Sequence, residues 1–347
     1  MMRKKLPPSR PKWAGRALVL PILAICCIAT LWIQGQAYYG SELALYHRLA
    51  GLQLPILYGL DYEPPPSILA PSVGVDIEAG VGDEIRVELL TIPPASMVDL
   101  AGSAPKVLIY HTHTTEAYLQ TSTYKFTPAG DEWRTHENDK NIVAVGEKLA
   151  TLLRDKYGIS VLHDITDHEP PKLATSYSRS VKTMEKYREQ YPSITMYIDV
   201  HRDAYGTKPT KPMDYIVING KEVARIMFVV GTGKGATGTG YGEMPDFSAN
   251  YALAKRITES LAAVNAGLVR NIRVKTGRYN QHISNQCLLV EIGHNANTLE
   301  QALNAIDYLA AAIAGSAGLD TGAILPASPS TPSPAPSATP NTARFAP

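Results

Sequence analysis

Three short apolar segments of strand type in this chain end in residues suited to metal or acid–base chemistry. The first, which begins after Lys106, ends in His111 and His113. The second ends in His201, and the third contains Glu291 near its end. A strand that ends in His-x-His places imidazoles on a rigid rim, where such sites are commonly built. Imidazole and carboxylate are ligands of catalytic zinc, so the three segments predict one shared site.

Strands and helices alternate between residues 106 and 318, and this alternation indicates the fold class. Strands are expected at residues 107–111, 160–163, 194–201, 215–218, 224–230, 272–274 and 287–292, and helices at residues 141–156, 173–190, 248–265 and 298–314. The order predicts an α/β domain with a mixed, largely parallel sheet and helices on both faces. Sites in such sheets lie at the carboxyl ends of strands, where the histidines and the glutamate are found.

The beginning of the chain indicates a membrane anchor. Residues 1–16 are basic and contain no acid, and residues 17–36 form an uncharged, apolar segment. A run of this length approaches the roughly 20 residues that span a bilayer, and the preceding basic residues predict a cytoplasmic N-terminus. A cleaved signal peptide is the alternative, although the apolar run exceeds the roughly 7–15 residues typical of one. We therefore expect a single-pass cell-membrane protein with most of the chain outside the membrane.

The remaining segments complete the expected domain organisation. Residues 37–105 are interpreted as a juxtamembrane helix and a linker, with a short strand at residues 84–90. Residues 106–318 form the site-bearing domain, and residues 319–347 form a tail rich in Pro, Ser and Thr that is too polar to fold. The net charge of +1 argues against a nucleic-acid partner, which usually requires a strong basic excess.

Roles for several residues follow from their neighbours. His111 and His113 point to the same side of an extended chain, so one is expected to bind metal and the other to orient a partner or contact substrate. Arg202 is expected to bind a substrate carboxylate. Glu291 lies between two apolar residues, and a pKa raised by such surroundings suits a general base acting on a metal-activated water.

A set of longer stretches extends these motifs. They are LIYHTHTTEAY, NIVAVGEKLA, SYSRSVKTMEKYREQYPSITMYIDVHRDA, FVVGT and YNQHISNQCLLVEIGHNANTLEQA, in this order within residues 106–318. Together they resemble the stage II sporulation protein P family, within the class of zinc-dependent N-acetylmuramoyl-L-alanine amidases. The resemblance implies an amidase-like fold and cleavage, with zinc as cofactor, of the amide between N-acetylmuramic acid and L-alanine in peptidoglycan.

The resemblance also implies which residues form the site. The zinc ligands of the amidase class map onto His113, Glu137 and His201, and the catalytic glutamate maps onto Glu291. Glu137 is chosen because it precedes an asparagine by four residues at a helix start, as the middle ligand does in the class.

Some of these assignments have alternatives. His111 competes with His113 as the first ligand, and Glu116 and Glu147 compete with Glu137 as the second. Asn280 and Asn295 are candidate hydrogen-bond donors to the substrate or to the tetrahedral intermediate.

The family resemblance further implies a cellular setting. It implies work at the septal membrane during engulfment in sporulation, with a lytic transglycosylase and a multi-pass membrane protein as partners. Endopeptidase activity from the same site is a second implied activity. The alternative to an enzyme is a catalytically inactive murein-binding or scaffold module.

Overall fold

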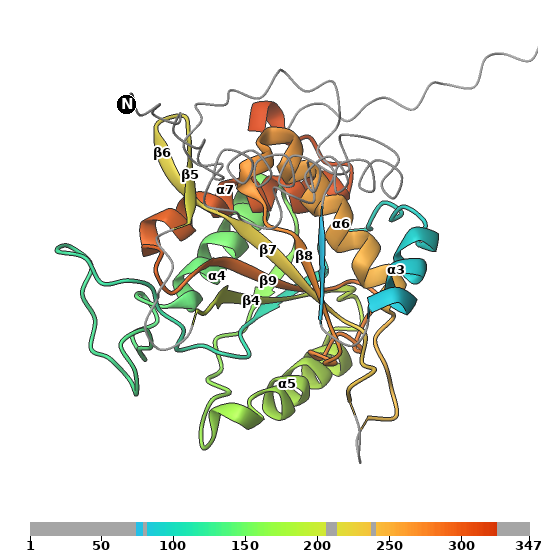
Figure 1. The fold of residues 1–347 in the computed structure, drawn as a ribbon, viewed down its shortest axis with the longest axis horizontal. Helices are drawn as coiled ribbons and strands as arrows, with labels where there is room; N and C mark the ends of the chain where they lie inside the picture. Colours follow the sequence, from blue (N-terminus) through green and yellow to red (C-terminus); the bar gives the residue numbers. More distant parts are fainter. Residues whose placement is uncertain (1–73, 79–81, 206–213, 237–240, 325–347) are drawn as a thin grey trace, which may run out of the picture. The chain divides into compact units, whose positions relative to one another are not determined.

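A seven-stranded sheet organises the part of the chain that the computed structural model describes, which is residues 74–78, 82–205, 214–236 and 241–324 (Figure 1). The strand order is β1-β8-β7-β9-β4-β2-β3. The strands are β1 (Val75–Ile77), β2 (Val107–Tyr110), β3 (Val161–His163), β4 (Met196–Asp203), β7 (Ile226–Gly231), β8 (Ile272–Lys275) and β9 (Cys287–His294). A separate hairpin consists of β5 (Tyr215–Ile218) and β6 (Lys221–Ala224).

The sheet consists of two parallel blocks that meet at one antiparallel seam. The block β9-β4-β2-β3 is parallel throughout, and so is the block β1-β8-β7. The two blocks join where β7 pairs antiparallel with β9. The prediction of a mixed, largely parallel sheet is therefore confirmed. In the first block, the register places His201 of β4 directly beside Glu291 of β9.

Helices cover both faces of the sheet, as predicted (Figure 1). One face packs against α4 (Ile142–Thr151), α6 (Phe247–Val264) and α7 (Leu299–Ser316), and the large apolar core lies between them and the strands. Side chains fix where these helices begin: Asn141, Asp246 and Thr298 each accept a backbone N–H of the first turn. Short helical turns lie at Leu152–Lys156, Leu173–Thr175, Ala266–Leu268 and Gly322–Ile324.

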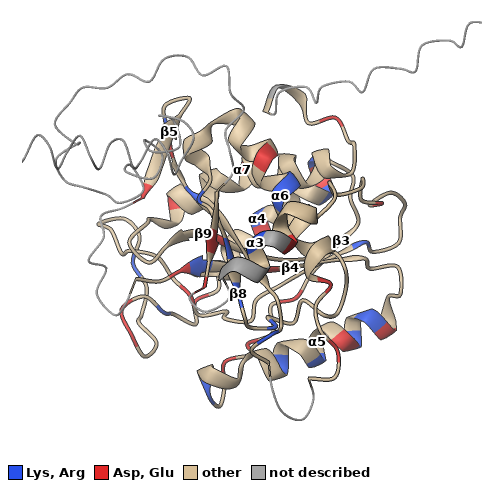
Figure 2. Ribbon diagram, turned by 45° about the vertical axis from the view of Figure 1, so that its right-hand side comes forward, with Lys and Arg blue, Asp and Glu red and all other residues tan. Residues whose placement is uncertain are grey.

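The opposite face of the sheet is covered less completely. There α5 (Tyr177–Gln190) buries Met184 against Tyr110 and Tyr197. Basic and acidic residues both occur along α5 (Figure 2). Tyr177, the first residue of α5, and Tyr279 pack over the apolar residues of β7 and β9. The residues that form the candidate site lie on this second face.

Two elements precede the expected start of the domain. The predicted strand at residues 84–90 is wrong, because this segment lies within a helix, α3 (Gly82–Thr91). Ile85 is buried and Leu89 packs against the core, and this four-residue spacing is helical. β1 lies in the range interpreted as a linker, yet it pairs with β8 and forms an edge of the sheet. Three residues are too few for a strand pattern to be recognised in sequence.

Several predicted segments lie outside the described residues. They are the basic segment 1–16, the anchor 17–36, residues 37–73 and most of the tail. None of the helices in the described part of the chain combines the length and the apolar character needed to cross a membrane.

Candidate metal and catalytic site

Two histidines and one glutamate converge at the carboxyl ends of β2 and β4. The ring centres of His113 and His201 are 5.4 Å apart, and the rings are nearly perpendicular. Nδ1 of His201 lies 3.5 Å from Oε2 of Glu116. His201 and Glu116 are buried, and His113 is nearly so. Residues from β4 and from the turn after β2 thus meet in one place, as the sequence predicted for His113 and His201.

The spacing of these groups fits a divalent cation. Two ligand atoms bound about 2.1 Å from a tetrahedral ion lie about 3.4 Å apart, which is close to the separation between His201 and Glu116. Nδ1 of His113 is buried and has no hydrogen-bond partner in the described part of the chain. Within the described residues, however, no three His, Cys, Asp or Glu side chains already stand as a complete metal site. The ligand-atom distance therefore fits a cation for the pair His201 and Glu116, and His113 lies beside this pair.

Glu291 lies beside this cluster. It pairs with His201 in the sheet register, so the two side chains share a face. Its Oε2 is buried and accepts no hydrogen bond from the described residues. Burial is the largest cause that raises the pKa of Glu291, His201 opposes it, and Glu116 and Asp203 support it, so that the pKa is raised to about 8. A carboxyl group with a pKa near neutrality can both accept and return a proton.

Asp199 is a member of the site that the sequence interpretation missed. Its Oδ1 lies 2.9 Å from Nε2 of His201, too poorly aligned for a hydrogen bond, and the two form a close ion pair. Thr112 donates to the Asp199 carboxylate from its backbone N–H and from its hydroxyl. Burial alone lowers the pKa of His201, but Asp199 and Glu116 together raise it well above its usual value. The sequence did contain a signal for this role. Asp199 and His201 are two residues apart in a strand, so their side chains share a face.

Replacing Asp199 should weaken the binding of zinc to the candidate site. Carboxylates behind a ligating histidine fix the ring orientation, and their loss commonly weakens metal binding about 10- to 100-fold. We expect Asp199→Asn to weaken zinc affinity by that factor in a chelator competition assay. Asp164→Asn, which changes a buried carboxylate that caps its own loop, should leave the affinity unchanged. Equal zinc affinity in both variants would contradict the role of Asp199.

The structure separates the three glutamates considered as the second ligand. Oε1 of Glu137 accepts a hydrogen bond of 2.7 Å from the backbone N–H of Thr127. The carboxylate of Glu147, a residue of α4, lies 2.8 Å from Nδ1 of His163. Of the three, Glu116 is the one that contacts His201. The assignment of Glu137 stays a prediction, and the geometry favours the alternative, Glu116.

His111 and His113 were expected to point to the same side of an extended chain, but the structure gives their rings different partners. Nδ1 of His111 donates to the carbonyl of Val200, and its Nε2 lies 2.9 Å from Nε2 of His163. The extended chain ends at Tyr110, and the following turn sends the two rings to different surroundings. His111 is fully buried and joins β2 to β4, which is a structural role.

The expected substrate role of Arg202 also needs correction. Its Nε donates to the carbonyl of Ala117, and one Nη donates to the carbonyl of Trp133. Its backbone N–H donates to Oε2 of Glu116. Arg202 is buried, so it holds the loop and positions Glu116 instead of facing substrate.

The two asparagines proposed as donors are likewise part of the framework. Nδ2 of Asn280 donates to the carbonyl of Tyr177 and to Oγ of Ser180, which ties the loop after β8 to α5. Oδ1 of Asn295 accepts the backbone N–H of Tyr205. Both asparagines are buried.

Further residues around His113 were not identified from the sequence. Nδ1 of His113 lies 3.8 Å from Oε1 of Glu169, which also accepts a hydrogen bond from Arg134. The Tyr177 ring packs edge-on against His113, and the Tyr279 ring packs edge-on against Tyr177. A row of aromatic rings therefore leads from the site across the sheet. These aromatic residues lie in loops or at the start of a helix, where the sequence has no periodic pattern from which they could be predicted.

The fold and the site define a mixed α/β protein with histidines and carboxylates gathered at the ends of its parallel strands. The chain belongs to the Stage II sporulation protein P (SpoIIP) family, whose model matches residues 76–314. The family resemblance noted in the sequence is thereby confirmed.

The comparisons also identify individual proteins similar to this chain. "Stage II sporulation protein P" of Bacillus subtilis is 27% identical over 220 residues, which are 60% of this chain and 50% of that protein. The chain thus spans about half the length of this relative. Among solved structures, amidase AmiC2 of Nostoc punctiforme has 16% identity and a TM-score of 0.36, covering 62% of this chain and 97% of that one. The CwlD amidase from Clostridioides difficile, in complex with the GerS lipoprotein, has 15% identity and a TM-score of 0.37. The match covers 61% of this chain and 94% of that one.

Proposed function

We propose that this protein is a peptidoglycan hydrolase that cleaves the amide bond between N-acetylmuramic acid and L-alanine of the stem peptide. The observation that carries the proposal is the convergence of His113, His201 and Glu116 beside the buried Glu291. Two imidazoles and one carboxylate leave a position open on a zinc ion, which is the donor set of catalytic zinc. Membership of the SpoIIP family supports a hydrolase that acts in sporulation.

Each residue of the site has a distinct task in this proposal. His113, His201 and Glu116 would hold a zinc ion, which when bound would supply Lewis acidity to the scissile carbonyl and to the attacking water. Glu291 would take a proton from the attacking water, whose oxygen bonds to the carbonyl carbon, and would return that proton to the L-alanine amine as the C–N bond breaks. Asp199 keeps the His201 ring in place from behind.

The setting of the reaction is part of the same proposal. A membrane anchor at residues 17–36 would hold the hydrolase at the cell membrane, with its site outside. Work at the septal membrane, with a lytic transglycosylase and a multi-pass membrane protein as partners, is expected from the family. Endopeptidase activity on peptide cross-links is a second activity to test, and an inactive murein-binding or scaffold module is the rival function.

The product of the reaction tests the proposal directly. We expect the full chain, loaded with zinc, to release stem peptides with free L-alanine amino termini from purified peptidoglycan. Chelation should stop the release, and added zinc should restore it. New amino termini within the peptide would instead indicate an endopeptidase. Binding of peptidoglycan without release of any fragment would favour the inactive module.

A further inference from the structure

The loop between β3 and α5 contacts the turn that carries His113. His168 of this loop is buried, and its Nδ1 donates to the carbonyl of His111 at 2.8 Å. The next residue, Glu169, accepts hydrogen bonds from Thr115. The loop therefore binds the turn on both sides of His113 along the chain.

Arg179 of α5 fixes the backbone of this loop. Its Nε donates to the carbonyl of His168 at 2.6 Å, and one Nη donates to the carbonyls of Glu169 and Lys172 at 2.9 and 2.7 Å. A guanidinium has five N–H donors in one rigid plane, so three carbonyls that meet at it are held in fixed relative positions. The conformation of the loop around Glu169 is thereby set.

The carboxylate of Glu169 is mostly buried and lies beside His113. Its Oε1 accepts a hydrogen bond of 2.9 Å from Nη1 of Arg134 and a longer one from the backbone N–H of Thr115, and its Oε2 accepts the Thr115 hydroxyl. Oε1 also lies 3.8 Å from Nδ1 of His113. The carboxylate is therefore fixed at a short distance from the ring.

Nδ1 of His113 lacks the partner that a zinc-bound imidazole requires. It is buried and makes no hydrogen bond to any residue that the structure describes. An imidazole that binds a metal through one nitrogen carries a proton on the other, and almost always donates it to a carboxylate, a carbonyl or water. Because an N–H···O bond is about 2.7–3.2 Å long, a displacement of less than about 1 Å brings Nδ1 to Oε1 of Glu169.

We propose that Glu169 is a positioning residue for His113: its carboxylate accepts the Nδ1–H of the ring when zinc is bound at Nε2, and so fixes the ring orientation. The inference rests on the proposed function and gives His113 the kind of support that Asp199 gives His201. Loss of the charge on Glu169 weakens this support, because a charge-assisted hydrogen bond is roughly twice as strong as a neutral one.

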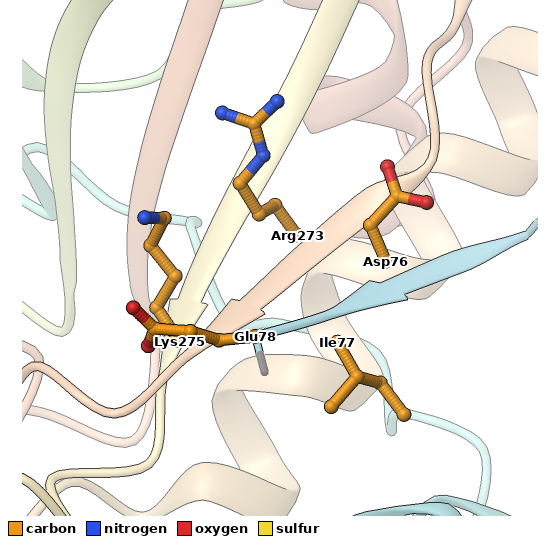
Figure 3. Close-up of a pocket in the computed structure, with 5 residues that line it drawn as sticks. All are labelled: Asp76, Ile77, Glu78, Arg273 and Lys275. Atoms are coloured by element: carbon orange, nitrogen blue, oxygen red, sulfur yellow. The ribbon is translucent and has the colours of Figure 1, made fainter. Parts of the chain in front are cut away.

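Glu78 provides a matched control on a distant part of the sheet. Like Glu169, it binds one threonine twice, because its Oε2 accepts the backbone N–H and the hydroxyl of Thr276. Figure 3 shows its carboxylate turned toward Lys275, in a small charged pocket between β1 and β8. Glu78 follows β1 and His113 follows β2, and the strands β8, β7, β9 and β4 lie between these two. Glu78 therefore has the hydrogen bonds of Glu169 to a threonine without its contact to a histidine of the site.

Chelator competition on the full chain measures the effect on zinc binding. We expect Glu169→Gln to bind zinc at least about tenfold more weakly than the wild type, as is typical when a carboxylate that supports a ligating histidine is lost. Glutamine retains an acceptor oxygen for Arg134 and Thr115, so the loop keeps its place. Glu78→Gln should bind zinc with the affinity of the wild type.

The His113 ring provides a second readout, which a purely structural role of Glu169 would not change. At saturating zinc, nuclear magnetic resonance of the full chain labelled with ¹⁵N-histidine should show a hydrogen-bonded proton on Nδ1 of His113. In Glu169→Gln this proton should remain on Nδ1 but shift upfield, because a neutral oxygen is a weaker acceptor than a carboxylate. In Glu78→Gln it should keep the position seen in the wild type.

The outcomes separate this inference from the proposed function. Equal zinc affinity in the wild type and Glu169→Gln, or an Nδ1 proton that the substitution does not shift, would overturn the inference even if amide cleavage were observed. Zinc bound to Nδ1 of His113 would overturn it as well. Weaker zinc binding and a shifted proton in a chain whose wild type releases no stem peptides would support the inference and overturn the proposed amidase activity.

Discussion

Glu291→Gln should abolish most hydrolysis while leaving zinc in place. Glutamine keeps the shape of the side chain but cannot take a proton from water, and general-base catalysis contributes about 10²- to 10⁴-fold to rates. We therefore expect a fall of this size in the release of stem peptides from purified peptidoglycan, with an unchanged zinc content by elemental analysis. Because Oε2 of Glu291 is buried without a hydrogen-bond partner in the described part of the chain, the amide should not destabilise the fold.

A matched variant separates the role of Glu291 from a general loss of charge. Glu300→Gln changes an exposed glutamate in the first turn of α7 and should retain full activity. A Glu291→Gln protein that hydrolyses peptidoglycan at the wild-type rate would exclude Glu291 as the base.

Glu116→Ala should remove the bound zinc, whereas Glu137→Ala should retain it. Loss of one of three protein ligands weakens binding beyond the roughly 100-fold that the loss of a supporting carboxylate causes. After dialysis, Glu116→Ala is expected to hold almost no zinc and Glu137→Ala about one ion per chain. His201→Ala should behave like Glu116→Ala.

Thermal unfolding with and without zinc provides a second readout for the same variants. A ligand that binds only the folded chain raises its stability, so zinc should raise the melting temperature of Glu137→Ala but not that of Glu116→Ala. The reverse pattern would restore Glu137 as the ligand and would show that the loop near Thr127 rearranges when zinc binds.

The sheet and the strands that carry the site could be predicted from the sequence because each strand has a local pattern of apolar residues. Apolar runs that end in polar residues mark β2, β4 and β9, and parallel pairing brings their ends to one edge. The convergence of His113 and His201 follows from these two facts alone.

The details that the sequence interpretation missed depend on turns and loops. Glu116 reaches His201 because the chain turns after Tyr110, and a strand pattern cannot specify that turn. The guanidinium of Arg202 donates to the backbone carbonyls of Ala117 and Trp133. Backbone carbonyls have no sequence signature, so the sequence did not reveal these partners, and Arg202 was assigned to the substrate. Helix α3 was mistaken for a strand because its short segment alternates as a strand would.

The position of β9 has a consequence for biosynthesis. β9 lies between β7 and β4 in the sheet, yet it is the last strand of the described sheet along the chain. The two halves of the sheet therefore cannot join, and Glu291 cannot meet His201, until translation has passed His294. A nascent chain that stops short of this point therefore carries no assembled site.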